Sequence, residues 1–132
     1  MEELNNEDML GTVGGACGGA CYTNASYPRV TITGHRALVN LGPKNCSCKN
    51  IKIVEMVLDG KNFTYNWPIN GSGVHYVGTD EVNYNQDRDK LQLRVKGSKI
   101  SKIKIKYEIG AGFGTKTKDC WVDFNAKGTY TA

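Results

Sequence analysis

Five cysteines are the residues of this chain whose type and spacing could support chemistry. They are Cys17, Cys21, Cys46, Cys48 and Cys120. Thiols in such an arrangement could bind zinc, stay reduced, or form disulfides. Zinc fits the spacing poorly, because the single residue between Cys46 and Cys48 points both thiols to one side of a strand and strains a tetrahedral site. We therefore predict no metal site.

Disulfides are the use of the cysteines that the sequence favours. Cys46 and Cys48 lie at the start of a predicted strand and face one side of the sheet, whereas Cys17 and Cys21 lie in a glycine-rich arm. The arm could fold back onto its own domain or reach a neighbouring subunit. An odd number of cysteines leaves one thiol for a bond between chains. Together with Cys120, these residues are the predicted disulfide or intersubunit positions.

Other residue types do not form a catalytic constellation. His35 lies in a predicted turn and His75 in a predicted strand, each outside any metal or nucleophile motif. The turn acids Asp80–Glu81 and Asp87–Asp89 are better explained as solvated turn residues than as a calcium site. No helix follows the glycine-rich segment Gly110–Gly114, which argues against nucleotide binding. We predict no catalytic residues, no cofactor and no enzymatic activity.

Charge is distributed unevenly along the chain. The first fifteen residues carry four acids and no base, while the remainder carries 17 bases and nine of the 13 acids. A basic body could attract an anionic polymer, although lysines that keep a sheet face solvated explain it as well. The residues that alternate with Lys102, Lys104 and Lys106 point to the opposite face, so this lysine strip is better explained as a solvated or edge-protecting face than as a nucleic-acid site. No apolar run reaches the roughly 18–20 residues of a membrane span, and no secretory apolar segment follows Met1.

Hydrophobic periodicity predicts one all-β domain. Residues 1–28 form a flexible arm rich in glycine and cysteine, and residues 29–132 form the domain. Apolar residues alternate with polar ones from Val30 onward, which indicates eight or nine short antiparallel strands in a β-sandwich or jelly roll. The predicted strands centre on residues 30–32, 37–41, 51–58, 63–67, 74–76, 82–84, 91–95, 103–109 and 120–130.

Local signals refine this prediction. Asp59-Gly60 is typical of a hairpin turn, and a change of phase near Ile53-Val54 indicates a bulge. Three aromatic residues in alternation, Phe63, Tyr65 and Trp67, are expected to face the core. Aromatic residues also supply the candidate ligand contacts of a carbohydrate-binding module, for which we select Tyr76, Tyr84 and Trp121.

The N-terminus resembles the double-glycine leader of exported bacteriocin-type peptides. The resemblance rests on Leu4, Asp8, Met9 and the pair Gly14-Gly15. It implies cleavage after Gly15 by a peptidase-containing transporter and export of a basic domain. An oxidising destination would then be reached without a secretory signal.

The overall plan resembles the subunits of bacterial endospore appendages. In that family, a flexible N-terminal connector with two cysteines precedes one β-sandwich and forms disulfides to the preceding subunit. The resemblance implies that Cys17 and Cys21 could join subunits into a fibre.

Three functions are consistent with these features. The leading hypothesis is a non-catalytic, self-assembling structural subunit of an extracellular or spore-surface fibre. The alternatives are a secreted bacteriocin-like or toxin-like protein cut after Gly15, and a carbohydrate-binding β-sandwich module. The partners expected are copies of the chain itself and a cell-surface polymer or glycan, and the location expected is extracellular or at a cell or spore surface.

Overall fold

A computed structural model of the chain describes residues 21, 26–44, 46–110 and 114–132. Ten strands cover most of these residues, where the sequence predicted eight or nine. Their bounds are β1 Arg29–Thr33, β2 Arg36–Asn40, β3 Ser47–Leu58, β4 Lys61–Pro68, β5 Ser72–Val77, β6 Asp80–Asp87, β7 Lys90–Lys96, β8 Ile100–Gly110, β9 Thr115–Asp123 and β10 Gly128–Thr131.

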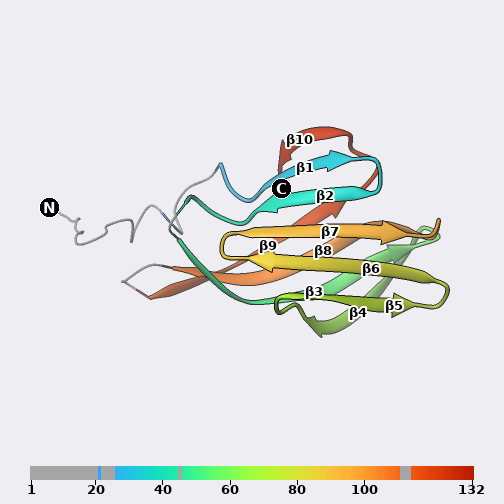
Figure 1. The fold of residues 1–132 in the computed structure, drawn as a ribbon, viewed down its shortest axis with the longest axis horizontal. Helices are drawn as coiled ribbons and strands as arrows, with labels where there is room; N and C mark the ends of the chain where they lie inside the picture. The colour runs from blue at the N-terminus through green and yellow to red at the C-terminus, as the bar shows by residue number, and fades with distance from the viewer. Residues whose placement is uncertain (1–20, 22–25, 45, 111–113) are drawn as a thin grey trace, which may run out of the picture.

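The strands form two antiparallel sheets that pack face to face (Figure 1). One sheet has six strands in the order β10-β1-β2-β7-β6-β5, and the other has four in the order β4-β3-β8-β9. This arrangement confirms the predicted all-β sandwich. The strand order does not establish the jelly-roll connectivity that the sequence suggested.

Alternation of apolar and polar residues places one face of each strand in the core. In β7, Leu91, Leu93 and Val95 are buried while their neighbours are exposed. In β8, every second residue from Ile103 to Ile109 is buried between the sheets. The opposite face of each sheet therefore carries mainly polar side chains, and a ligand that binds to a sheet would contact that face.

The hairpin between β3 and β4 forms where the sequence predicted it. Asp59 and Gly60 have φ values of 50° and 79°, as a two-residue turn of this kind requires. The register between β3 and β4 shifts between Ile53 and Glu55, which confirms the predicted bulge.

The last predicted strand, residues 120–130, is two strands in different sheets. β9 ends at Asp123, and the chain crosses to β10, which pairs with β1 in the six-stranded sheet. The crossing is fixed by the hydroxyl of Tyr130, which accepts a hydrogen bond of 2.7 Å from the backbone N–H of Asp123. Gly128 adopts a φ of 99° at the start of β10. Alternation alone could not show this change of sheet, because the period of two continues on both sides.

Two predictions about charged residues need correction. The lysine strip lies on β8, which pairs with strands on both sides, so it does not protect a sheet edge. Its central member, Lys104, forms ion pairs with Glu55 at 3.5 Å and with Asp119 at 3.9 Å. Asp80, expected in a solvated turn, is 3% exposed.

Candidate functional site

A disulfide joins Cys21 to Cys46, with a Cα–Cα distance of 5.6 Å. It ties the segment that precedes β1 to the loop between β2 and β3. The bond is within one chain, which is one of the two arrangements that the sequence left open. Cys17 lies outside the residues that the structure describes.

Cys48 and Cys120 are free thiols, and their surroundings lower their reactivity. Burial raises the pKa of Cys48 to about 12, with a smaller contribution from the charge of Asp89. Burial likewise raises the pKa of Cys120 to about 12, and its side chain is only 3% exposed. Since the thiolate is the species that attacks a disulfide, both groups exchange slowly at neutral pH. A bond from Cys120 to another chain would require local opening of β9.

The three predicted ligand aromatics lie on different faces of the molecule. Tyr76 is 67% exposed on the outer face of the six-stranded sheet. Tyr84 faces inward, and its ring stacks on His75 at 5.1 Å between centroids. Trp121 lies on the outer face of the other sheet, where the Lys104 ammonium is 5.8 Å from its ring centroid. They form no common platform.

A line of stacked rings closes the side of the sandwich between β4 and β5. Tyr65 packs on Trp67 at 4.3 Å, and Trp67 stacks on His75 at 4.7 Å. His75, interpreted from the sequence as an ordinary residue, thus links aromatic residues of both sheets. All of these rings are partly buried, so the line extends the core. The predicted inward face of β4 is confirmed for Tyr65 and Trp67, whereas Phe63 is 45% exposed.

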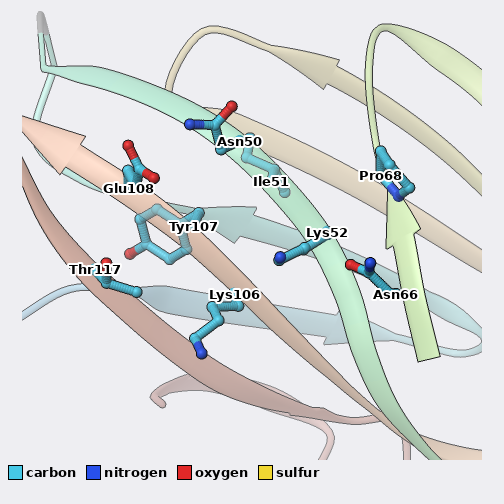
Figure 2. Close-up of a pocket in the computed structure, with 9 residues that line it drawn as sticks. All are labelled: Asn50, Ile51, Lys52, Asn66, Pro68, Lys106, Tyr107, Glu108 and Thr117. Atoms are coloured by element: carbon cyan, nitrogen blue, oxygen red, sulfur yellow. The ribbon is translucent and has the colours of Figure 1, made fainter. Parts of the chain in front are cut away.

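One hollow lies on the outer face of the four-stranded sheet (Figure 2). It has a volume of about 500 Å³, and its polar lining comes mainly from β3, β4, β8 and β9. Figure 2 shows Lys52 and Asn66 on one side, Glu108 with Thr117 on the other, and Lys106 between them. The carboxylate on the same surface offsets part of the lysine charge, so this hollow has no marked preference for one ligand charge.

A larger groove lies on the outer face of the six-stranded sheet. It has a volume of about 600 Å³ and crosses β1, β2, β7 and β6. The outward side chains that line it are Thr31, Thr33, Arg36, Leu38, Asn83, Asn85, Gln92 and Arg94. The volume of the groove lies within the roughly 300–1,000 Å³ of ligand sites, and its outward lining is more polar than the mostly apolar lining of sites for small molecules.

Strand register explains how this groove is assembled. Thr31 is opposite Leu38, Leu38 is opposite Gln92, and Gln92 is opposite Asn85. These four residues come from four strands and form one row across the sheet. Because the partners are distant in sequence, no local motif marks the groove, and the sequence alone does not reveal it.

One polar atom of the groove has no hydrogen-bond partner. The side-chain nitrogen of Asn83 is buried and donates to no acceptor among the residues described, and no other buried side-chain nitrogen or oxygen there is left without a partner. Buried donors in proteins nearly always have an acceptor, so this exception marks the groove rather than the hollow of Figure 2.

Among the described residues, no three histidine, cysteine or acidic side chains lie close enough together to hold a metal ion. Over the same part of the chain, there is no helix of the length and hydrophobicity needed to span a membrane. The predicted cleavage site, Gly14-Gly15, lies outside the described residues, as does the centre of the glycine-rich segment, residues 111–113.

Comparisons of the chain with protein-family models, with curated proteins and with solved structures found no match.

Proposed function

We propose that this chain is a non-catalytic binding module that holds a glycan in the groove on the outer face of the six-stranded sheet. The observation that carries the proposal is the row of Thr31, Leu38, Gln92 and Asn85, which crosses four strands inside that groove. Hydroxyl and amide groups can both donate and accept hydrogen bonds, as sugar hydroxyls require. Leu38 supplies an apolar surface between them.

Tyr76 provides further support for a glycan. It lies on the same face as the groove, opposite Glu81, which is two residues before Asn83 on β6. A ring that is 67% exposed gains stability when a flat apolar surface such as a sugar ring covers it. The groove crosses four strands of an outer sheet face, which suits a segment of a polymer better than a small enclosed ligand.

Replacement of Gln92 by alanine tests the position of the site. Gln92→Ala removes hydrogen bonds at the centre of the groove and is expected to weaken glycan binding about tenfold. The measurement is isothermal titration calorimetry with a panel of soluble neutral and acidic oligosaccharides.

The matched control is Asn66→Ala, which removes an exposed amide at the hollow of Figure 2. It should leave the affinity unchanged. A loss of glycan affinity with Asn66→Ala, and not with Gln92→Ala, would place the site on the four-stranded sheet. If the parent protein bound no glycan at all, the proposal would be refuted.

The second candidate function is a structural subunit of an extracellular or spore-surface fibre. The observation that favours it is the Cys21–Cys46 disulfide, which fixes the domain end of the arm. Cys17, four residues earlier in the sequence, would then be the arm thiol left for a neighbouring subunit. Fibre formation and glycan binding are compatible, since the groove lies on a sheet face and the arm joins at the end of the sandwich.

Electrophoresis without reductant, together with electron microscopy, tests the fibre. If Cys17 of one chain bonds to Cys48 of the next, the full-length chain gives a ladder of covalent oligomers under oxidising conditions, and Cys17→Ser abolishes it. Cys120→Ala, which removes a buried thiol, should leave the ladder intact. A clean monomer under oxidising conditions would argue against a fibre and direct attention to cleavage after Gly15, which mass spectrometry of the exported product would detect.

A further inference from the structure

The groove contains two arginines directly opposite each other. Arg36 on β2 is the register partner of Arg94 on β7, and Arg94 is in turn the partner of Asn83 on β6. Alternation points all three side chains outward, because their neighbours Ala37, Leu93 and Val82 are buried. The three form a second row across the groove, next to the row of Thr31, Leu38, Gln92 and Asn85.

Without a bound ligand, the two opposed arginines destabilise the sheet. Like charges directly opposite each other on neighbouring strands destabilise a sheet. Neither arginine forms an ion pair within the described part of the chain, where the recorded pairs join Lys104 to Glu55 and Asp119 on the other sheet. The outward positions of β1, β2, β6 and β7 carry five bases against two acids, Glu81 and Asp87, so the face is positive.

Asn83, the third residue of this row, has a buried side-chain nitrogen without a hydrogen-bond acceptor among the described residues. Arginine has only donors, so Arg36 and Arg94 present donors to the groove beside a further donor, the Asn83 nitrogen, which lies beneath the surface. A negatively charged oxygen group bound here would relieve the repulsion and accept hydrogen bonds from both arginines.

We propose that the groove binds an acidic polysaccharide and that Arg36 and Arg94 hold the carboxylate or sulfate of one sugar unit. The proposal rests on the glycan-binding function and names its ligand class. The arginine fork matches the geometry of such an oxyanion. The adjacent row of amides and hydroxyls then contacts the neutral hydroxyls of the same polymer.

Nucleic acid would supply anions too, but the groove lacks what a nucleic acid needs. Single strands are held largely by aromatic rings that stack on successive bases. On the outward positions of the six strands of this sheet, Tyr76 is the only aromatic residue. The face therefore favours a sugar polymer over single-stranded DNA or RNA.

The test compares ligands that differ only in charge. Full-length protein is titrated with an oligogalacturonide, with its methyl-esterified form and with a sulfated oligosaccharide. We expect the acidic ligands to bind at least about tenfold more tightly than the ester, and added salt to reduce the difference. Equal binding of acid and ester would overturn the anion site but leave the glycan module standing. No binding of any of them would overturn both.

Two double variants show whether the preference for acidic ligands comes from the two arginines or from the overall charge of the protein. Arg36→Gln with Arg94→Gln should abolish the preference for acid, whereas Lys102→Gln with Lys106→Gln, on the other sheet, should retain it. If both double variants lost the preference for acid equally, net charge alone would attract the ligand, and the arginine site would be refuted. Binding of single-stranded DNA that depends on the arginines, with no binding of acidic oligosaccharide, would also overturn it.

Stability provides an independent readout. Because the arginine variant removes a repulsion, we expect its urea midpoint to equal or exceed that of the parent protein. A lower midpoint would show that the arginines stabilise the sheet, which contradicts the premise of the proposal.

Discussion

Removal of the Cys21–Cys46 disulfide is expected to lower the free energy of unfolding by about 3 kcal/mol. The bond joins residues that are 25 positions apart, so it restricts the unfolded chain by closing a loop of that length. Cys21 and Cys46 are also 0% and 6% exposed, and they belong to the core. Urea unfolding of the Cys21→Ala, Cys46→Ala double variant measures the difference.

Reductant provides the matched control for this experiment. In a Cys17→Ser background, it should destabilise the disulfide-bonded protein by a similar amount and leave the double variant unchanged, because Cys48 and Cys120 have no bond to lose. If reductant had no effect on the parent, the arm would not be tied to the domain by this bond in solution.

Replacement of Asp80 by alanine is expected to cost about 2–3 kcal/mol, the upper part of the range for leaving buried backbone donors without an acceptor. Asp80 is 3% exposed, and one carboxylate oxygen accepts hydrogen bonds from the backbone N–H groups of Lys99 and Ile100, at 2.9 and 3.4 Å. It thereby fixes the turn from β7 into β8 and links the two sheets.

The residue that faces the Asp80 carboxylate in this turn has to be a glycine. Gly97 adopts a φ of 110°, and a Cβ atom there would collide with the Asp80 carboxylate. Asp80→Asn keeps one acceptor oxygen and should cost about 1 kcal/mol. Glu81→Ala, on the outward side of the same strand, should change stability by less than about 0.5 kcal/mol. Equal effects of Asp80→Ala and Glu81→Ala in urea unfolding would contradict this role.

The sequence predicted the features that depend on near neighbours. Alternation identified the inward faces of β7 and β8, and Asp59-Gly60 identified the hairpin. These signals are local because side-chain direction in a strand repeats every two residues, and a turn of two residues needs positive φ.

Features that depend on strand pairing were not predictable in this way. Alternation could not place Asp123 and Tyr130 in different sheets, and it could not bring Arg36 opposite Arg94. The same limit applies to His75, whose stacking between Trp67 and Tyr84 requires β4 to lie beside β5. The candidate groove belongs to this second group, because its residues converge only through register.

Pairing of β1 with β10 also has a consequence for folding kinetics. Thr31 and Thr129 contact each other across 98 positions, whereas the hairpins β3–β4, β5–β6 and β6–β7 join adjacent segments. Closing so long a loop costs more entropy than closing a hairpin, and proteins dominated by such contacts fold in milliseconds to seconds. During synthesis on the ribosome, β1 keeps one edge unpaired until β10 has been made. This edge is thus exposed to wrong pairing for most of the synthesis of the chain.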